Sequence, residues 1–342
     1  MPISLAESKA KLLTVSRYVN AVRSLLRVPT YLLMLLYYTV AFIGAGGAGG
    51  AWNYALGALA IAAWYVNATS LNDLSDYEID QVNLPGDPDR PLVAGVLNRP
   101  HLQVIALSSG VLALVLVAIF GWLALGLMAA LVALNAAYSL PPVVISRRGG
   151  LALALLPIGY VVLTMGLGSL AAGRIPGGWL AALIALSYVQ FVARISLKDY
   201  RDVTGDAQFG KRTFLLRHGS PAVVRLALGC HLAAGLAGAA LLYPTSPARA
   251  AGYVFLGTVA ASMLMRLHTA TAWPAQRVWI SAYGRLVSGQ LVVILLEVLV
   301  RSGAVQGNVR QYFLLGLIVA TFAWSTLMVV RRQNNPSARI IS

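Results

Sequence analysis

Long apolar runs dominate the hydrophobic pattern of this chain, and short polar stretches separate them. The runs are roughly 17–25 residues long, which is the length that an α-helix needs to cross about 30 Å of hydrocarbon. The pattern therefore predicts an all-α, multi-pass transmembrane bundle of nine to ten spans. The ten candidate spans are residues 30–46, 52–72, 102–120, 122–140, 151–171, 178–197, 221–243, 249–267, 284–300 and 311–330.

The composition supports a membrane protein and not a soluble one. Of the 342 residues, 58% are hydrophobic and 11% are charged, whereas about 25% are charged in an average soluble domain. The formal net charge of +15 would suit a nucleic-acid-binding protein, but the basic residues lie at the ends of the apolar runs and not in one stripe. Nucleic acid is therefore not an expected partner.

The basic residues predict the orientation of the chain, because cytosolic loops carry the excess of Lys and Arg. They concentrate on the side that holds the two long loops, at about 73–100 and 198–220. We expect a multi-pass protein of the cell membrane with both loops in the cytosol. The chain then divides into a cytosolic amphipathic segment (1–29), a transmembrane domain (30–330) and a cytosolic basic tail (331–342); the first segment is also basic enough for an organellar transit peptide.

Nearly all of the negative charge lies in these two loops. Of the 11 acidic residues, only Glu7 and Glu297 lie elsewhere. The first loop contains N-D-L-S-D-Y-E-I-D and the second K-D-Y-R-D-V-T-G-D, so both carry D-x-x-D-x-x-x-D. The repeated carboxylates are Asp73, Asp76, Asp80, Asp199, Asp202 and Asp206.

This spacing predicts a site for divalent cations. On a helix, offsets of three, four and seven place the carboxylates along one face, where each neighbouring pair would repel by about 3 kcal/mol. A compensating cation is therefore expected, and hard ions such as Mg²⁺, with Mn²⁺ as a substitute, prefer carboxylate oxygens and substrate phosphates. The alternative, solvated loop acids that end helices, does not explain why the spacing is repeated on one face of the membrane.

Basic residues are interleaved with these acids, and a site for metal ions alone would not need them. A diphosphate would, because Arg and Lys bind phosphate oxygens well. The candidate ligands of such a group are Arg90, Arg194, Lys198, Arg201, Lys211 and Arg212.

The motifs resemble those of the UbiA family of intramembrane prenyltransferases over roughly residues 20–300. The stretch Y-S-L-P-P at 138–142 and the order of the motifs also resemble that family, whereas G-D-P-D at 86–89 and the tenth apolar run depart from it. The matching motif positions are Asn72, Asp73, Asp76, Asp80, Asn83, Arg90, Pro91, Gly95, Asp199, Asp202, Gly205, Asp206, Gly210 and Thr213.

The resemblance implies a central cavity capped by the two cytosolic loops, in which Mg²⁺ bridges the aspartates and a prenyl diphosphate. It places Asp73, Asp76, Asp199, Lys198 and Tyr138 in catalysis and Asn72 beside the metal. Loss of diphosphate would leave an allylic cation, and aromatic faces can stabilise a cation. The candidate aromatic residues are Tyr65, Tyr138, Tyr188 and Phe191, although aromatic residues in a bundle also serve packing.

The acceptor is the part of the function that remains open. We expect a small hydrophobic or aromatic acceptor, most simply an aromatic ring as in quinone or tocopherol-type biosynthesis, with membrane lipid around the enzyme. The alternatives are a UbiA-type terpene cyclase, or transfer to a non-aromatic lipid or pigment. Asn67 and Asn135, inside spans, either line the acceptor pocket or bridge helices. A divalent-cation transporter would place acids along a pore, and only Glu297 lies inside a predicted span.

Overall fold

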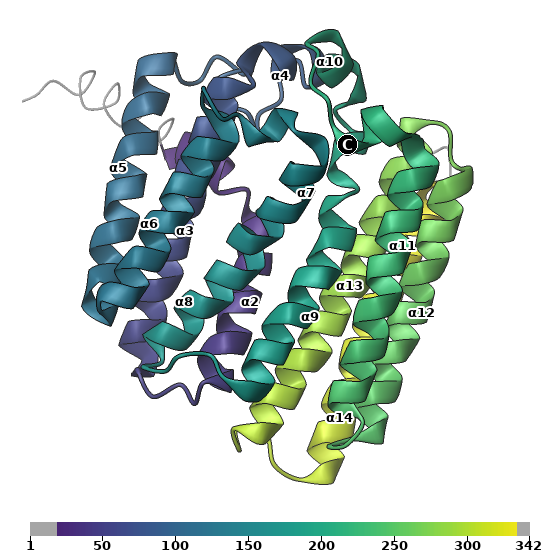
Figure 1. Cartoon of the computed structure of the whole chain (residues 1–342). Coiled ribbons are helices and arrows are strands. Elements are labelled where there is room, and N and C mark those ends of the chain that lie inside the picture. The colour runs from purple at the N-terminus through teal and green to yellow at the C-terminus, as the bar shows by residue number, and fades with distance from the viewer. Residues whose placement is uncertain (1–18, 334–342) are drawn as a thin grey trace, which may run out of the picture.

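The chain folds as an antiparallel bundle of long helices, and the all-α fold class is confirmed. The computed structural model describes residues 19–333. Its long helices run between two ends of the molecule (Figure 1). The helices of the bundle are α2 (Val28–Gly44), α3 (Gly50–Ser75), α5 (Arg99–Val117), α6 (Trp122–Ser139), α7 (Gly149–Pro157), α8 (Thr164–Ala171), α9 (Gly178–Ile195), α11 (Phe214–Leu242), α12 (Pro247–Thr269), α13 (Trp273–Arg301) and α14 (Asn308–Gln333), of which α7 and α8 together make one span.

Short elements join these helices at their ends. Two of them, α4 (Tyr77–Asn83) and α10 (Val203–Gln208), pack against each other at one end of the bundle, the upper end in Figure 1. We call this end the α4–α10 end. The remaining short elements are η1 (Ala118–Phe120), η2 (Ile145–Arg147), η3 (Ile158–Leu163) and η4 (Lys198–Tyr200).

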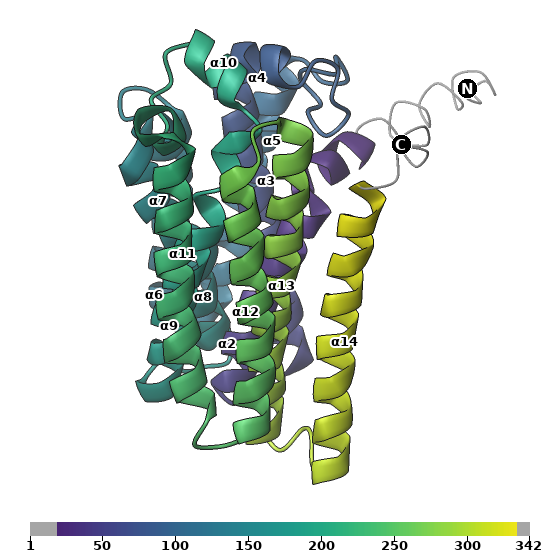
Figure 2. The same cartoon turned by 90° about the vertical axis from the view of Figure 1, so that its right-hand side faces the viewer.

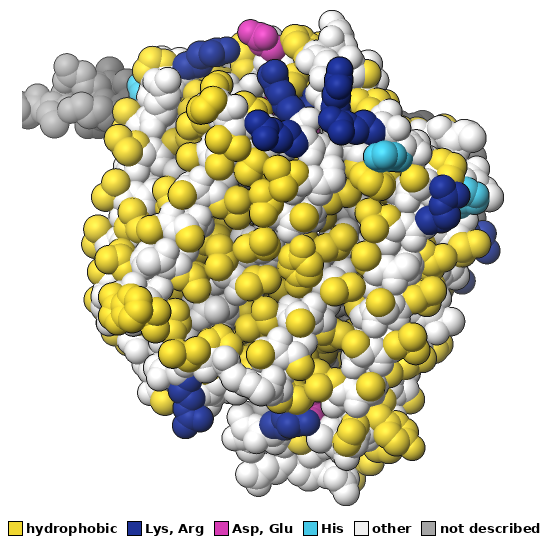
Figure 3. Space-filling view, in the orientation of Figure 1, with side chains coloured by type: hydrophobic (Ala, Val, Ile, Leu, Met, Phe, Trp, Pro, Cys, Tyr) yellow, Lys and Arg dark blue, Asp and Glu magenta, His cyan; other side chains and the backbone are white. Residues whose placement is uncertain are grey.

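The predicted number of spans is confirmed. Within residues 19–333, nine helices are long and apolar enough to cross a membrane, and a tenth span results if Val19–Leu26 and Val28–Gly44, which meet at 57°, count as one. Hydrophobic side chains cover the middle of the visible surface, while Lys and Arg gather towards its ends (Figure 3). The proposed domain limits at 29 and 330 stay predictions, and residues 1–18 and 334–342 lie outside the described part.

The helix ends differ from the predicted spans where backbone geometry, not apolarity, decides them. The span 151–171 contains a π-turn (Ile158–Leu163) directly after Pro157, a residue that lacks the backbone N–H an α-helix needs. Helix α13 begins at Trp273 and not at 284, because Pro274 suits the first turn and polar residues continue the helix past the apolar run.

The tenth apolar run forms helix α14, on the outside of α13 and α12 (Figure 2). A buried ionic network fixes it at the end opposite α4 and α10. Glu297, fully buried in α13, accepts from Arg249 Nε and Arg301 Nε at 2.6 Å each, and Arg249 Nη1 donates to Gln311 of α14 at 2.8 Å. The acid inside a predicted span is thus neutralised by two arginines in a network that holds helices together.

Candidate functional site

The first aspartate motif lies at a helix corner above the bundle. Asp73 is in the last turn of α3, Asp76 separates α3 from α4 with φ −97° and ψ 13°, and Asp80 is in α4. The motif therefore spans the end of one helix and the start of the next, and its carboxylates do not share the face of one continuous helix. The break allows α4 to turn across the end of the bundle, and the acidic first turn of α4 interacts favourably with its helix dipole.

The second motif repeats this arrangement after α9. Asp199 is in the 3₁₀-turn η4, Asp202 precedes α10, and Asp206 is inside α10. The carboxylates Asp199 and Asp206 are buried, whereas Asp202 is half-buried. Both motifs thus leave a long helix, turn, and continue in a short helix at the same end of the bundle.

Asn83 joins the two motifs. Its Nδ2 donates to the Asp202 carbonyl at 3.0 Å, and its Oδ1 accepts from the Gly205 amide at 2.6 Å. A Cβ on Gly205 would lie 2.7 Å from Asn83 Nδ2, so only glycine permits this approach. Both residues belong to the motif positions in the sequence, but this contact between them was not predicted.

Basic side chains lie between the carboxylates. Arg90 contacts Asp73 and also Asp80, at 3.2 Å. Lys211 bridges the two motifs, with Nζ 3.0 Å from Asp76 Oδ2 and 3.4 Å from Asp206 Oδ1.

Three more cations pair with single carboxylates at this end of the bundle. Lys198 contacts Asp199, and Arg201 donates to Asp202 at 2.7 Å. Arg27, which the sequence analysis did not assign to the site, donates to Asp73 at 2.7 Å. Its position two residues before Pro29, at the start of the first span, was the signal that could have indicated a role.

Burial raises the pKa of two carboxyl groups in this cluster. It raises the pKa of Asp80 to about 7, against the lowering effect of Arg90, and neighbouring Asp73 raises it further. It raises the pKa of Asp206 to about 6, against Lys211. Both groups therefore titrate close to neutral pH.

The carboxylates fit divalent ions that share their ligands with a phosphate. Asp73 Oδ2 and Asp76 Oδ1 are buried and have no hydrogen-bond partner among the described residues. No three acidic, histidine or cysteine side chains of residues 19–333 converge to hold an ion by themselves. Mg²⁺, however, commonly takes one or two carboxylates and completes its shell with substrate phosphates and water.

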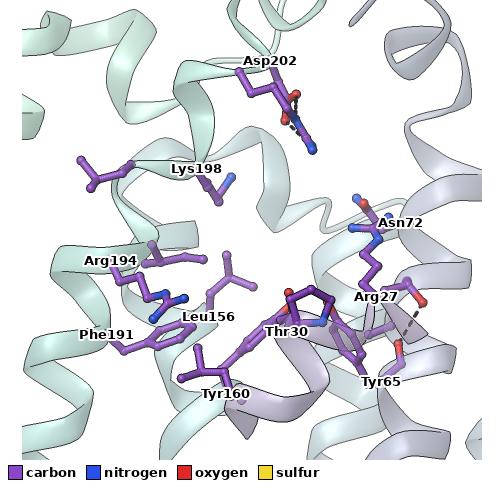
Figure 4. A pocket seen from close by; sticks show the side chains of 18 of the residues that line it. Arg27, Thr30, Tyr65, Asn72, Leu156, Tyr160, Phe191, Arg194, Lys198 and Asp202 are labelled. Carbon is purple, nitrogen blue, oxygen red and sulfur yellow. Dashed lines mark hydrogen bonds and ion pairs between the residues drawn. The ribbon is translucent and has the colours of Figure 1, made fainter. Parts of the chain in front are cut away.

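A cavity of about 820 Å³ lies below the motifs. Asn72 lines its polar upper part and connects two site residues, since its Nδ2 donates to Asp76 at 2.9 Å and its Oδ1 accepts from Arg90 at 3.4 Å. The charged lining residues, several of which appear in Figure 4, are Arg27, Asp76, Asp80, Arg90, Arg194, Lys198, Arg201, Asp202, Asp206, Lys211 and Arg285.

The deeper wall of the cavity is aromatic and apolar. Tyr160 stacks on Phe191 with ring centroids 5.4 Å apart and meets Tyr65 edge-on at 6.0 Å. Tyr138 lines the same cavity. Tyr160, which the sequence analysis missed, is carried by the π-turn η3; Pro157 in an apolar run was the available signal.

Five predicted residues do not line this cavity. Asp73 and Asp199 are buried behind Arg90 and Lys198. Arg212 is exposed, and Tyr188 donates to the Ala154 carbonyl at 3.1 Å. Asn67 lies between helices.

The asparagine pair bridges helices. Asn67 of α3 donates to the Ala106 carbonyl of α5 at 2.8 Å and accepts from Asn135 of α6 at 2.9 Å. Asn135 also borders the cavity. Bridging therefore accounts for Asn67, while Asn135 does both.

Comparisons with known proteins agree with this geometry. The family model described as the UbiA prenyltransferase family matches residues 32–289. The chain is 31% identical to the digeranylgeranylglyceryl phosphate synthase of Natronomonas pharaonis over 214 residues, which are 60% of this chain and 70% of the relative. It is 30% identical over 228 residues to the enzyme of that name from Ignicoccus hospitalis, with 64% and 70% covered.

A solved structure shares the fold. A UbiA homologue from Archaeoglobus fulgidus, bound to GPP and Mg²⁺, superposes with a TM-score of 0.65 at 16% identity, over 80% of this chain and 98% of that one. Helix α14 begins at Asn308, beyond the end of the family match at residue 289.

Proposed function

The chain belongs to the UbiA prenyltransferase family, and we propose that it transfers a prenyl group from a prenyl diphosphate to a phosphate-bearing glycerol lipid, with Mg²⁺ as cofactor. The curated relatives are named for the synthesis of digeranylgeranylglyceryl phosphate. This supports the non-aromatic lipid alternative better than the aromatic acceptor that the sequence analysis favoured. Prenyl transfer is the activity of the family; the acceptor and the metal are the parts proposed for this chain.

One observation carries the proposal. Two acidic motifs more than 100 residues apart converge, with their cations, on the polar mouth of a cavity whose deeper wall is apolar and aromatic. A prenyl diphosphate has the matching distribution, with a highly charged head and an apolar tail. Nucleophilic amino acids are not needed in such a site, because the diphosphate is itself a leaving group.

The residues divide the work of binding and charge stabilisation. Asp73, Asp76 and Asp80 on one side, and Asp199, Asp202 and Asp206 on the other, would hold the divalent ions. When bound, such ions neutralise the charge that develops on a departing phosphate oxygen. Arg90, Lys198 and Lys211 add fixed positive charge at the same place.

The reaction breaks the bond between donor C1 and the diphosphate oxygen, and the electron pair leaves with the diphosphate. A hydroxyl oxygen of the acceptor then forms the new bond to C1 and releases its proton to water or to the diphosphate. The wall that contains Tyr138, Tyr160 and Phe191 keeps water from the allylic carbon. Aromatic faces can also stabilise its positive charge.

The test is a transfer assay with the purified full-length protein. It receives Mg²⁺ and a prenyl diphosphate together with either a monoalkyl glycerol phosphate or a phenol, and the products are identified by mass spectrometry. We expect a prenyl ether of the glycerol phosphate. Prenylation of the phenol alone would contradict the proposed acceptor, and diphosphate release with a cyclised hydrocarbon and no acceptor would indicate a terpene cyclase.

A further inference from the structure

Two arginines that line the cavity have no carboxylate partner among the described residues. Arg27, Arg90, Lys198, Arg201 and Lys211 each pair with an aspartate of the motifs. Arg194 of α9 and Arg285 of α13 border the same cavity without such a pair. The titratable neighbours of Arg194 are the hydroxyls of Tyr37 and Tyr283, not acids.

The position of Arg194 is fixed by α13. Its Nη1 donates to the Gly284 carbonyl at 3.1 Å and to Ser288 Oγ at 2.9 Å. Ser288 Oγ in turn donates to the Gly284 carbonyl at 2.9 Å. Both hydrogen bonds of Arg194 use Nη1, so Nη2 and Nε have no partner among the described residues and remain available as donors to a ligand.

Gly284 lies beside the guanidinium of Arg194. A Cβ at this position would lie 3.6 Å from Arg194 Nη2. Arg285, the next residue of α13, is exposed and forms no ion pair with an acid of residues 19–333. Arg194, by contrast, is half-buried, and its charged neighbours include no acid. A partly buried positive charge without a counter-charge is costly, which points to an anion as the missing partner.

Arg194 lies deeper than the diphosphate site. In Figure 4 it is below Lys198, beside Phe191 and away from Asp202. Of the labelled residues of the charged cluster, Asp202 and Lys198 lie above it. An anion between α9 and α13 is therefore displaced from the head of the donor and lies along the wall where the acceptor has to reach the donor carbon.

We propose that Arg194 and Arg285, with Ser288 as the positioning residue of Arg194, bind the phosphate headgroup of the acceptor lipid at a subsite separate from the diphosphate site. This inference rests on the proposed function, since it assigns the acceptor to that same cavity. A guanidinium recognises phosphate with two parallel N–H donors. The phosphate would hold the acceptor so that its hydroxyl, a few bonds away, faces donor C1.

The test compares binding of two lipids to the full-length protein in metal-free buffer, where no metal ion on the aspartates can bind a phosphate. The probes are a monoalkyl glycerol phosphate and the uncharged monoalkyl glycerol of the same chain length, titrated by calorimetry. Charged hydrogen bonds of this kind are worth about tenfold or more in affinity. The wild type should prefer the phosphate by at least that factor, and Arg194→Gln with Arg285→Gln should abolish the preference.

Matched variants separate this role from a structural one. Arg277→Gln removes an exposed arginine of the same helix that does not line the cavity, and it should keep the preference. Arg194→Lys should restore part of it. Arg285→Gln alone, at an exposed position, keeps the proposal testable if Arg194→Gln fails to fold.

Further arms identify the source of the phosphate. With Mg²⁺ present, the affinity for the prenyl diphosphate should be the same in the wild type and the double variant. If the double variant loses as much affinity for the prenyl diphosphate as for the phosphate lipid, the arginines belong to the diphosphate site and the proposal is overturned. Inorganic phosphate that binds as tightly as the lipid would overturn it as well. If the enzyme prenylates the monoalkyl glycerol phosphate and the uncharged monoalkyl glycerol equally well, the phosphate subsite is refuted but the proposed function is not. If it binds the phosphate lipid selectively but does not prenylate it, the proposed function is refuted but the subsite is not.

Discussion

At the scale of single residues, the site is an alternation of buried carboxylates and cations. The acidic half of this alternation is visible in the sequence as a repeated spacing. The pairing is not, because it joins residues far apart in the chain: Arg27 reaches Asp73, and Lys211 reaches Asp76. Such partners are fixed by how the helices pack, and no local pattern encodes them.

The adjacent residues Lys211 and Arg212 give a matched test of donor recognition. Lys211 is buried between both motifs, whereas Arg212 is exposed and outside the cavity. Lys211→Met should weaken binding of the prenyl diphosphate by roughly tenfold or more, because a charge-assisted hydrogen bond is lost. Arg212→Met should leave donor affinity unchanged, contrary to the expectation from sequence. If both variants bind the donor equally, the claim that Lys211 belongs to the donor site and Arg212 does not is contradicted.

The raised pKa values predict how metal binding depends on pH. Burial raises the pKa of Asp80 to about 7 and that of Asp206 to about 6, and a metal ion binds only the ionised carboxylate. Mg²⁺ affinity, measured by titration, should therefore fall as the pH is lowered from about 8 to about 6. Affinity that stays constant over this range would show that neither group is a ligand.

The same pKa values affect stability with the opposite sign. Between the reference value of 3.8 and about 7, the folded state binds the Asp80 proton more tightly than the unfolded state does. The metal-free protein should therefore lose stability as the pH rises through this window. A thermal melting series in EDTA checks the sign.

At the scale of the element, each aspartate motif is a helix corner and not a helix face. The sequence indicated the acids, their shared side of the membrane and their order. It did not indicate the breaks at Asp76 and Asp202, because the spacing of three and four suits a helix as well as a turn followed by a helix. The contact of Asn83 with α10, like the ion pair of Arg27 with Asp73, could not be predicted because it joins residues far apart in the chain.

The close approach of α4 and α10 predicts the effect of a single methyl group. Gly205→Ala places a Cβ against Asn83, and overpacking of this kind costs about 1–3 kcal/mol. It should separate the motifs and weaken Mg²⁺-dependent donor binding. The control is Gly235→Ala in α11, where a Cβ meets no atom within 4 Å; a Gly205→Ala variant that binds donor as well as this control would contradict the role of the junction.

At the scale of the whole molecule, the length of the apolar runs was enough to predict the helical bundle, whereas the cavity and its capping by the two loops were expected only from the resemblance to the UbiA family. The aromatic wall was predicted only in part, since Tyr65 and Phe191 were candidates but Tyr160 depended on an unpredicted π-turn. The acceptor could not be predicted, because the motifs that carry the pattern bind the donor. The tenth helix was predicted as an apolar run, but its ionic attachment through Arg249 and Gln311 was not.

The orientation of the bundle is predicted by its basic residues. In a Cys230→Ala background, Gln81→Cys and Gln208→Cys place exposed thiols at the α4–α10 end, and Gln306→Cys places one at the opposite end. An impermeant thiol reagent added to intact cells should label only the Gln306→Cys variant. Labelling of the other two from outside would reverse the orientation.

The central claim is that the two motifs form a single site, and a double-mutant cycle tests it most directly. Asp76 and Asp202 both line the cavity and pair with different cations, Lys211 and Arg201, so a shared lysine cannot couple them. Diphosphate release is measured at saturating Mg²⁺ for Asp76→Asn, Asp202→Asn and the double variant. Asp89→Asn, an exposed acid of the same first loop that does not line the cavity, is the control.

Groups that act as a unit are strongly non-additive. We therefore expect each single variant to lose most of its activity, the double variant to be little worse than the poorer single variant, and EDTA to abolish turnover in the wild type. Losses that multiply in the double variant, or wild-type activity in either single variant, would contradict a site shared by the two motifs.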